Sequence, residues 1–269
     1  MVSLRTIGVI VALTSIVILA LAIRLQPLKY GLYLYEYDPF FMYYTTKYLV
    51  EHGPFSWLEL TKEHVKNFWY PTGRDVWNTE YPGVPYIGYL SYTIVKPLLP
   101  NIDGEYLLLV IANVLPPIFG AITVIFAFLI GRELVDEKVG LLSALFTAVV
   151  PAAVDRTIAG FYTKLGFGVA FFIVSLYFTI KSLKAGTLKW NILYSIVGGI
   201  FLGLVGFTWG GVSFAILAYA AYLIFSVFIG LNDRSQARTF TILFLTAVSY
   251  THLRAHETSL HLVCRLLLE

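Results

Sequence analysis

Two groups of charged residues are the places where this sequence could do chemistry. The first lies in the string E-Y-D-P-F-F at residues 36–41, where Asp38 offers the oxygen ligands that hard divalent cations prefer. A purely structural interpretation is also open, because an Asp before a Pro is typical of a helix N-cap, with Pro39 as the first helical residue. The sequence alone leaves both interpretations open.

The second group lies between Asp155 and Lys164, after one long apolar run and before another. Arg156 and Lys164 could bind an anionic phosphate, and Gly160 allows the segment to turn. The alternative is an ordinary interfacial segment whose basic side chains reach lipid phosphates. The sequence contains no convincing Ser/His/Asp arrangement or phosphate-binding loop, which disfavours the enzyme classes built on them.

The composition indicates which elements must position these groups. Of 269 residues, 58% are hydrophobic and 13% are charged, whereas soluble domains contain roughly a quarter charged residues. The net charge of +3, from 19 basic and 16 acidic residues, is too balanced for a nucleic-acid-binding surface, so no nucleic-acid partner is expected. We therefore expect an all-α fold, a polytopic α-helical protein of the lipid bilayer.

Apolar runs separated by short charged segments predict about seven membrane-spanning helices. We interpret the first run as a signal anchor, because no small-residue cleavage site follows it. The predicted runs are Ile7–Ile23, Tyr106–Ile130, Val139–Val154, Gly166–Ile180, Ile192–Phe207, Val212–Leu231 and one that begins near Phe240. Six glycines near the end of the fifth run and the start of the sixth predict close helix packing there.

The segment Gly83–Leu99 decides the orientation. If it does not span, most basic residues of the short connections lie on one side, which the positive-inside rule makes cytoplasmic. We therefore predict a re-entrant or interfacial segment here, a cytoplasmic N-terminus and one long outer loop at residues 24–105, with an interfacial helix at Pro39–His52. The basic residues on the predicted cytoplasmic side are Arg5, Arg132, Lys138, Lys181, Lys184, Lys189, Arg234 and Arg238.

The last 22 residues, 248–269, differ from the rest. They contain the only Cys and three of the five His, and their string resembles translated sequencing-adapter read-through rather than native protein. A metal site in this tail is a poor interpretation for that reason. We expect native sequence over residues 1–247, as the N-terminal part of a longer membrane domain.

Three motifs in this order resemble the catalytic subunit of oligosaccharyltransferase, the archaeal dolichyl-phosphooligosaccharide–protein glycosyltransferase family. They are the E-Y-D-P-F-F string, the F-W-Y-P-T-G…E-Y-P-G run of the long loop, and D-R-T-I-A-G-F-Y at residues 155–162. The resemblance implies a multispan cell-membrane enzyme whose catalytic loops face outward. It also implies a dolichyl-linked oligosaccharide donor, an acceptor polypeptide with Asn-x-Ser/Thr and a later soluble domain, which we expect to be missing from this chain.

The resemblance also assigns roles to single residues. Asp38 is expected to bind Mn²⁺ or Mg²⁺ and to take part in catalysis together with Arg156. From their positive charge rather than from the resemblance, Arg156 and Lys164 are expected to bind lipid phosphate or substrate. The family's second acidic motif is lost, because Thr163 and Leu165 stand where carboxylates are expected. Two alternatives stay open: a non-catalytic paralogue that binds lipid-linked sugar, or a transporter component, which the clustering of charges in loops disfavours.

Overall fold

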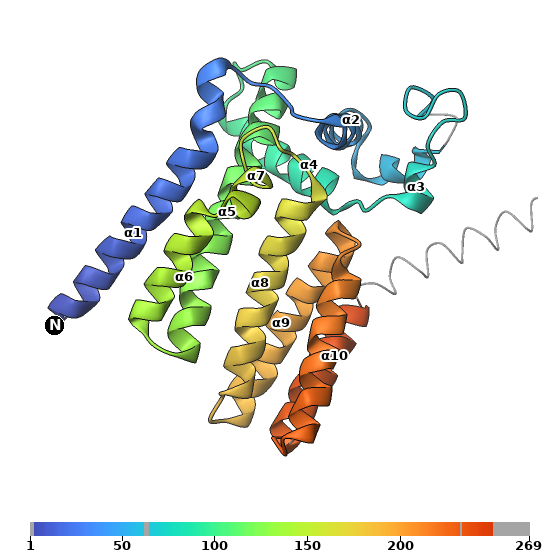
Figure 1. The fold of residues 1–269 in the computed structure, drawn as a ribbon. Coiled ribbons are helices and arrows are strands. Elements are labelled where there is room, and N and C mark those ends of the chain that lie inside the picture. Colours follow the sequence, from blue (N-terminus) through green and yellow to red (C-terminus); the bar gives the residue numbers. More distant parts are fainter. Residues whose placement is uncertain (1–2, 62–64, 232, 250–269) are drawn as a thin grey trace, which may run out of the picture.

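The computed structural model describes residues 3–61, 65–231 and 233–249, and in this part of the chain every regular element is a helix. The all-α prediction is therefore confirmed. Seven of the described helices run up and down the molecule (Figure 1): α1 (Leu4–Leu25), α5 (Gly104–Leu134), α6 (Glu137–Val149), α8 (Lys164–Leu183), α9 (Leu188–Thr208), α10 (Val212–Phe228) and a last helix at residues 234–249.

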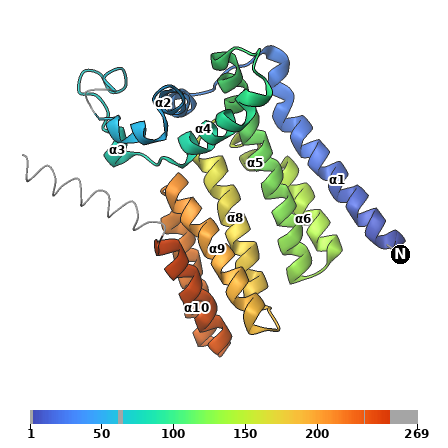
Figure 2. The ribbon, with the colours of Figure 1, turned by 180° about the vertical axis from the view of Figure 1, so that it is seen from behind.

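Four of the described helices are long and apolar enough to cross a membrane: Leu4–Tyr30, which joins α1 to the 3-10 helix η1 (Gln26–Tyr30), α5, α8 and α9. The helices α6 and α10 and the helix at residues 234–249 are shorter and run beside them (Figure 2). The predicted last span begins at residue 234, six residues before Phe240. Of the predicted non-native tail, residues 250–269 lie outside the described residues.

The predicted run Val139–Val154 is not one helix. The helix α6 ends at Val149, and a separate short helix, α7 (Pro151–Asp155), follows. Pro151 explains the break, because proline has no N–H to donate to the carbonyl of Thr147 and its ring crowds the preceding turn.

The remaining elements lie across one end of the bundle. They are α2 (Tyr37–His52), seen nearly end-on in Figure 1, the short α3 (Val76–Thr79), α4 (Gly83–Val95) and two 3-10 helices, η2 (Pro54–Glu59) and η3 (Lys96–Leu98). The 13 residues of α4 span only about 20 Å, which is too short to cross a bilayer. This agrees with the prediction that Gly83–Leu99 does not span.

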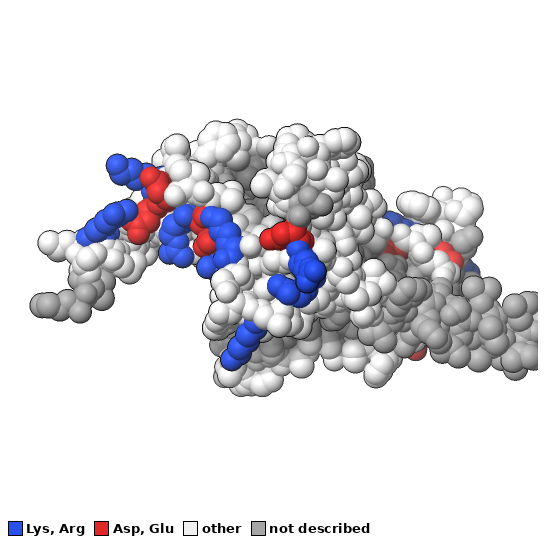
Figure 3. Space-filling model, turned by 90° about the horizontal axis from the view of Figure 1, so that it is seen from below, with Lys and Arg blue, Asp and Glu red and all other residues white. Residues whose placement is uncertain are grey.

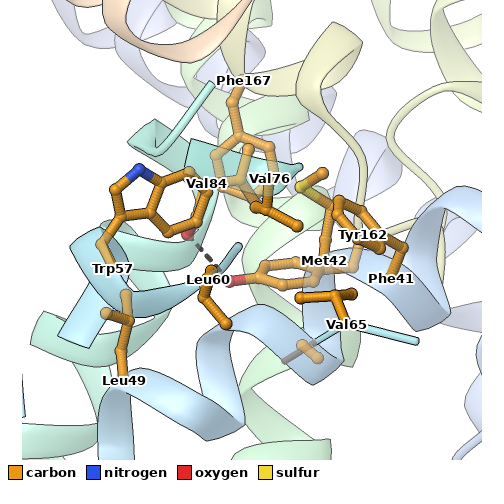
Figure 4. Close-up of a cluster of buried hydrophobic side chains, with 11 residues drawn as sticks. Phe41, Met42, Leu49, Trp57, Leu60, Val65, Val76, Val84, Tyr162 and Phe167 are labelled. Carbon is orange, nitrogen blue, oxygen red and sulfur yellow. Dashed lines mark hydrogen bonds between the residues drawn. The ribbon is translucent and has the colours of Figure 1, made fainter. Parts of the chain in front are cut away.

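This crosswise layer has its own apolar core, shown in Figure 4. Tyr162, which precedes α8, is fully buried there, and its hydroxyl donates to the carbonyl of Val84 at 2.9 Å. The same hydroxyl lies 3.2 Å from Thr46 Oγ1 of α2. Burial raises the pKa of the Tyr162 phenol, so it stays a neutral donor. One side chain thus joins α2 and α4 to the bundle.

Glycines set the helix spacing inside the bundle, as predicted. A Cβ on Gly199 of α9 would lie 2.6 Å from the carbonyl oxygen of Leu243 in the last helix, so only glycine permits this approach. In the same way, a Cβ on Gly131 of α5 would lie 2.9 Å from the Cα of Gly140 in α6. These small-residue contacts align the helices and so fix where their ends, and the loops at those ends, lie.

Opposite ends of the bundle differ in charge. The end away from α2 and α4 carries the basic residues predicted to be cytoplasmic, and Figure 3 shows Lys and Arg side chains gathered there. Two contacts at this end anchor the helices. Arg5 pairs with Glu137 at 2.7 Å, and Lys181 of α8 pairs with Glu133 of α5 at 3.3 Å.

Candidate functional site

The two charged motifs of the sequence meet at the end of the bundle covered by α2 and α4. The backbone N–H of Tyr35, just before α2, donates to the carbonyl of Gly160 at 3.2 Å. Gly160 has φ +84°, and a Cβ on it would lie 2.2 Å from the carbonyl oxygen of Tyr33. The backbone conformation and the space therefore both require glycine at this contact.

Asp38 lies in the first turn of α2 with an exposed side chain. It is not the N-cap, so that structural interpretation is wrong: Glu36 occupies the cap position with φ 62°, and the helix already begins at Tyr37. In the described part of the chain the Asp38 carboxylate makes no hydrogen bond or ion pair. A free carboxylate beside the unpaired N–H groups of a helix start is electrostatically favourable, and it remains available to a ligand.

Arg156 follows α7 and is also exposed. Its guanidinium carbon lies 5.2 Å from the centroid of the buried Phe161 ring, which restricts its orientation. A hydrogen bond anchors the segment that carries Arg156 to the last turn of α1: the N–H of Ala159 donates to the carbonyl of Arg24 at 2.8 Å. Arg156 is therefore an exposed cation on a segment that hydrogen bonds connect to Arg24 and, through Gly160, to Tyr35.

Arg24 itself is a buried cation that sequence reasoning missed, because it looked like the flank of the first span. Its side chain is 1% exposed. Nε donates to Thr157 Oγ1 at 2.8 Å, and the terminal nitrogens donate to the carbonyls of Ala148 at 2.8 Å and Thr147 at 3.3 Å. Arg24 thus joins α1, the end of α6 and the segment that carries Arg156.

Lys164 does not lie free beside Asp38, because its ammonium pairs with a buried carboxylate. Nζ lies 2.5 Å from Oε1 of Glu80, and Nη2 of Arg74 donates to Oε2 of the same carboxylate. Glu80 is 1% exposed. Sequence reasoning identified the E-Y-P-G motif but not this set of three side chains, since 84 positions separate Glu80 from Lys164.

The lost acidic motif opens α8. Thr163 is the N-cap of this helix and is buried, with no hydrogen-bond partner at Oγ1, and Leu165 is half-buried in the first turn. Neither can bind a cation as a carboxylate would. Among residues 3–61, 65–231 and 233–249, no three His, Cys, Asp or Glu side chains form a group suited to a metal.

A divalent cation therefore does not fit the donor set of the described residues. Asp38 contributes one carboxylate. Thr163 and Leu165, which stand where the family has acidic residues, are uncharged, and the Glu80 carboxylate already pairs with the side chains of Arg74 and Lys164. Since the number of carboxylate charges dominates affinity for hard cations, the expected Mn²⁺ or Mg²⁺ site is incomplete in the described residues.

Sequence comparison places residues 9–261 in the family described as "Oligosaccharyl transferase STT3, N-terminal". The dolichyl-diphosphooligosaccharide–protein glycosyltransferase subunit STT3B of Oryza sativa subsp. japonica is 30% identical over 217 residues, which cover 79% of this chain. The STT3 subunit of Dictyostelium discoideum is 30% identical over 208 residues, or 77% of the chain. In both cases the chain spans 28% of the relative's length.

Solved structures give the same fold. The archaeal oligosaccharyltransferase AglB from Archaeoglobus fulgidus, in complex with an inhibitory peptide and a dolichol-phosphate, superposes with a TM-score of 0.75 and 18% identity. The match covers 91% of this chain and 29% of that one. A second structure of the Archaeoglobus fulgidus enzyme, a complex with Zn and sulfate, gives a TM-score of 0.71 at 18% identity, over 89% of this chain and 30% of that one.

Proposed function

The chain belongs to the STT3 family of oligosaccharyl transferases, and on this premise we propose that it forms the N-terminal part of a membrane glycosyltransferase. The proposed reaction transfers an oligosaccharide from a dolichyl (pyro)phosphate donor to the Asn of Asn-x-Ser/Thr in an acceptor polypeptide. The protein lies in the membrane, and family membership makes the transporter alternative unnecessary.

One observation carries the assignment to particular residues. The Tyr35–Gly160 hydrogen bond joins the segment that leads into Asp38 to the segment that carries Arg156. A carboxylate and a guanidinium on exposed, rigidly held backbone are the groups that can orient an acceptor amide and neutralise a departing phosphate. We propose Asp38 and Arg156 as the catalytic residues, whereas the ammonium of Lys164 is paired with Glu80.

The neighbours support the substrate classes. The Archaeoglobus fulgidus structure holds a dolichol-phosphate and an inhibitory peptide, and we propose the same two classes of ligand for this protein. A Mn²⁺ or Mg²⁺ ion does not fit the carboxylates of the described residues, so we assign it no part in the proposed reaction. Asp38 is the residue of this chain that would contact such an ion, and the single carboxylate leaves that site incomplete.

The proposed orientation follows from the distribution of basic residues. The end of the bundle with Arg132, Lys184 and Lys189 would face the cytoplasm of a cell, and the end with α2 and α4 would face outward. The donor phosphate and the acceptor would then meet at the outer face of the cell membrane.

Substitution of Asp38 in the full-length protein tests the assignment. Asp38→Asn removes the charge at constant size, and we expect glycopeptide formation from a lipid-linked oligosaccharide and a sequon peptide to fall by about 100-fold or more. Glu51→Gln, on the last turns of the same helix and also exposed, is the matched control and should leave the rate unchanged. Equal rates for Asp38→Asn and the unaltered protein would refute the role.

The lost acidic motif specifically favours a second candidate function, in which the protein binds lipid-linked sugar without transferring it. The same preparation distinguishes the two. Retained donor binding with no glycopeptide from the unaltered full-length protein would favour the binding paralogue, whereas measurable turnover would exclude it.

A further inference from the structure

Glu80 is a buried carboxylate that the proposed reaction does not use. It lies in the long loop, directly after α3 and before α4, and its side chain is 1% exposed. Carboxylates are almost never buried this completely unless they are paired, because removing their charge from water is costly. The partners of Glu80 therefore show what the carboxylate does.

One partner comes from the loop itself. Arg74 donates to Oε2 of Glu80, and its guanidinium carbon lies 4.1 Å from the centroid of the Phe41 ring in α2. The N–H of Arg74 also donates to the carbonyl of Val65 at 3.3 Å. Through Arg74, the carboxylate is connected to both the loop backbone and α2.

The other partner comes from the bundle. Lys164 is the first residue of α8, and its ammonium lies 2.5 Å from Oε1 of Glu80. The same Oε1 accepts the N–H of Tyr81 at 3.0 Å. Both oxygens of the carboxylate are thus engaged, one by the loop and one shared between the loop and α8.

The charges of Glu80 and Lys164 allow a direct ion pair between the loop and α8, in contrast to two segments that are joined through a bound metal ion. A divalent cation joins two segments when each offers a carboxylate. Here α8 offers an ammonium between Thr163 and Leu165, and the loop offers the carboxylate, so the two segments attract each other directly. The Lys164 and Arg74 side chains are 23% and 17% exposed, so water screens these contacts only partly.

We propose that Glu80 is a positioning residue whose carboxylate, shared by Arg74 and Lys164, fastens the outer loop to the start of α8 without a divalent cation. This arrangement fixes the loop at the end of the bundle where the Tyr35–Gly160 hydrogen bond joins the segments that carry Asp38 and Arg156. The loop would be held in this way whether or not the protein transfers a glycan.

Hydrogen–deuterium exchange of the full chain in lipid nanodiscs tests the proposal. We expect Glu80→Gln to raise amide exchange in peptides covering residues 65–82 by about tenfold or more, because it leaves two cations without their shared counter-ion. Glu105→Gln is the matched control: it removes an ion pair of similar length, 2.7 Å to Lys47, on an exposed carboxylate, and should leave this region unchanged.

Variants of Lys164 separate a positioning role from a general loss of stability. Lys164→Met leaves the Glu80–Arg74 pair in place, so the chain should fold while exchange in residues 65–82 rises. Lys164→Arg should restore protection, since a guanidinium can also reach the carboxylate. The double variant Glu80→Gln with Lys164→Met should raise amide exchange in residues 65–82 only slightly more than the stronger of the two single variants, because the two groups share one interaction.

Cations provide the second readout. Exchange of the unaltered chain in residues 65–82 should be the same with Mn²⁺ and with EDTA. Faster amide exchange of the unaltered chain with EDTA than with Mn²⁺ would overturn the proposal. Exchange rates of Glu80→Gln or Lys164→Met within about twofold of the unaltered chain would also overturn it, because this is the scale of a weak surface ion pair.

Discussion

Replacement of Arg24 by Met should destabilise this protein more than any change of an exposed charge. Arg24 lies in the last turn of α1 with a 1% exposed side chain, and four of its five side-chain N–H groups have acceptors in the structure. Met keeps most of the apolar stem but donates no hydrogen bond. The change therefore isolates the role of the guanidinium.

The magnitude follows from the acceptors left behind. The carbonyls of Thr147 and Ala148 lie in the last turn of α6, and Pro151 cannot donate to the first of them. The other two acceptors keep partners: Ala20 O is within a helix, and the Thr157 hydroxyl donates to Ala153 at 2.6 Å. One buried carbonyl, of Ala148, and one partly buried carbonyl, of Thr147, left unsatisfied at about 1–2 kcal/mol each give a loss of about 2–4 kcal/mol.

The assay is the free energy of unfolding in mixed detergent micelles, followed by circular dichroism. Arg5→Met is the control on the same helix: its side chain is 74% exposed and pairs with Glu137, so the loss should be below about 1 kcal/mol. Equal stability of Arg24→Met and the unaltered chain would refute the reasoning that the guanidinium satisfies the end of α6.

Two further predictions concern the metal site and the orientation. Thr163→Asp combined with Leu165→Glu should raise Mn²⁺ affinity, measured by calorimetry, by about tenfold or more, because added carboxylates dominate affinity for hard cations; an unchanged affinity would mean that this segment does not face Asp38. A cysteine in place of Leu188, which is 56% exposed at the start of α9, should react with membrane-impermeant maleimide only after the cell membrane is opened. Labelling of this cysteine in intact cells would contradict the proposed orientation and place the start of α9 on the outer side.

Much of the fold could be predicted from local sequence because the membrane imposes a simple rule. Backbone polar groups in lipid must be satisfied within the segment, so long apolar runs become helices. The run Ile192–Phe207 lies inside α9, and the short Gly83–Leu99 segment gives α4 and η3 rather than a long span. Pro151 also carried the signal for the α6–α7 break, although the hydropathy of the surrounding run obscured it.

The candidate site was predictable only in part. The motifs around Asp38 and Arg156 could be identified as strings, and the structure brings their segments together through Tyr35 and Gly160. The N-cap interpretation of Asp38 failed because cap position depends on where the chain turns, and Glu36 adopts a positive φ that sequence does not reveal.

The sequence by itself determined the class of the protein, most of its long helices and the two charged motifs, since these depend on residues close together in the chain. Tertiary structure alone decided the partners of the buried charges. Arg24 and Thr157 lie 133 positions apart, and Glu80 and Lys164 lie 84 apart. Electrostatic pairing acts over a few ångströms in space, so only the packing of α8 against the outer loop could show that Lys164 is held by Glu80.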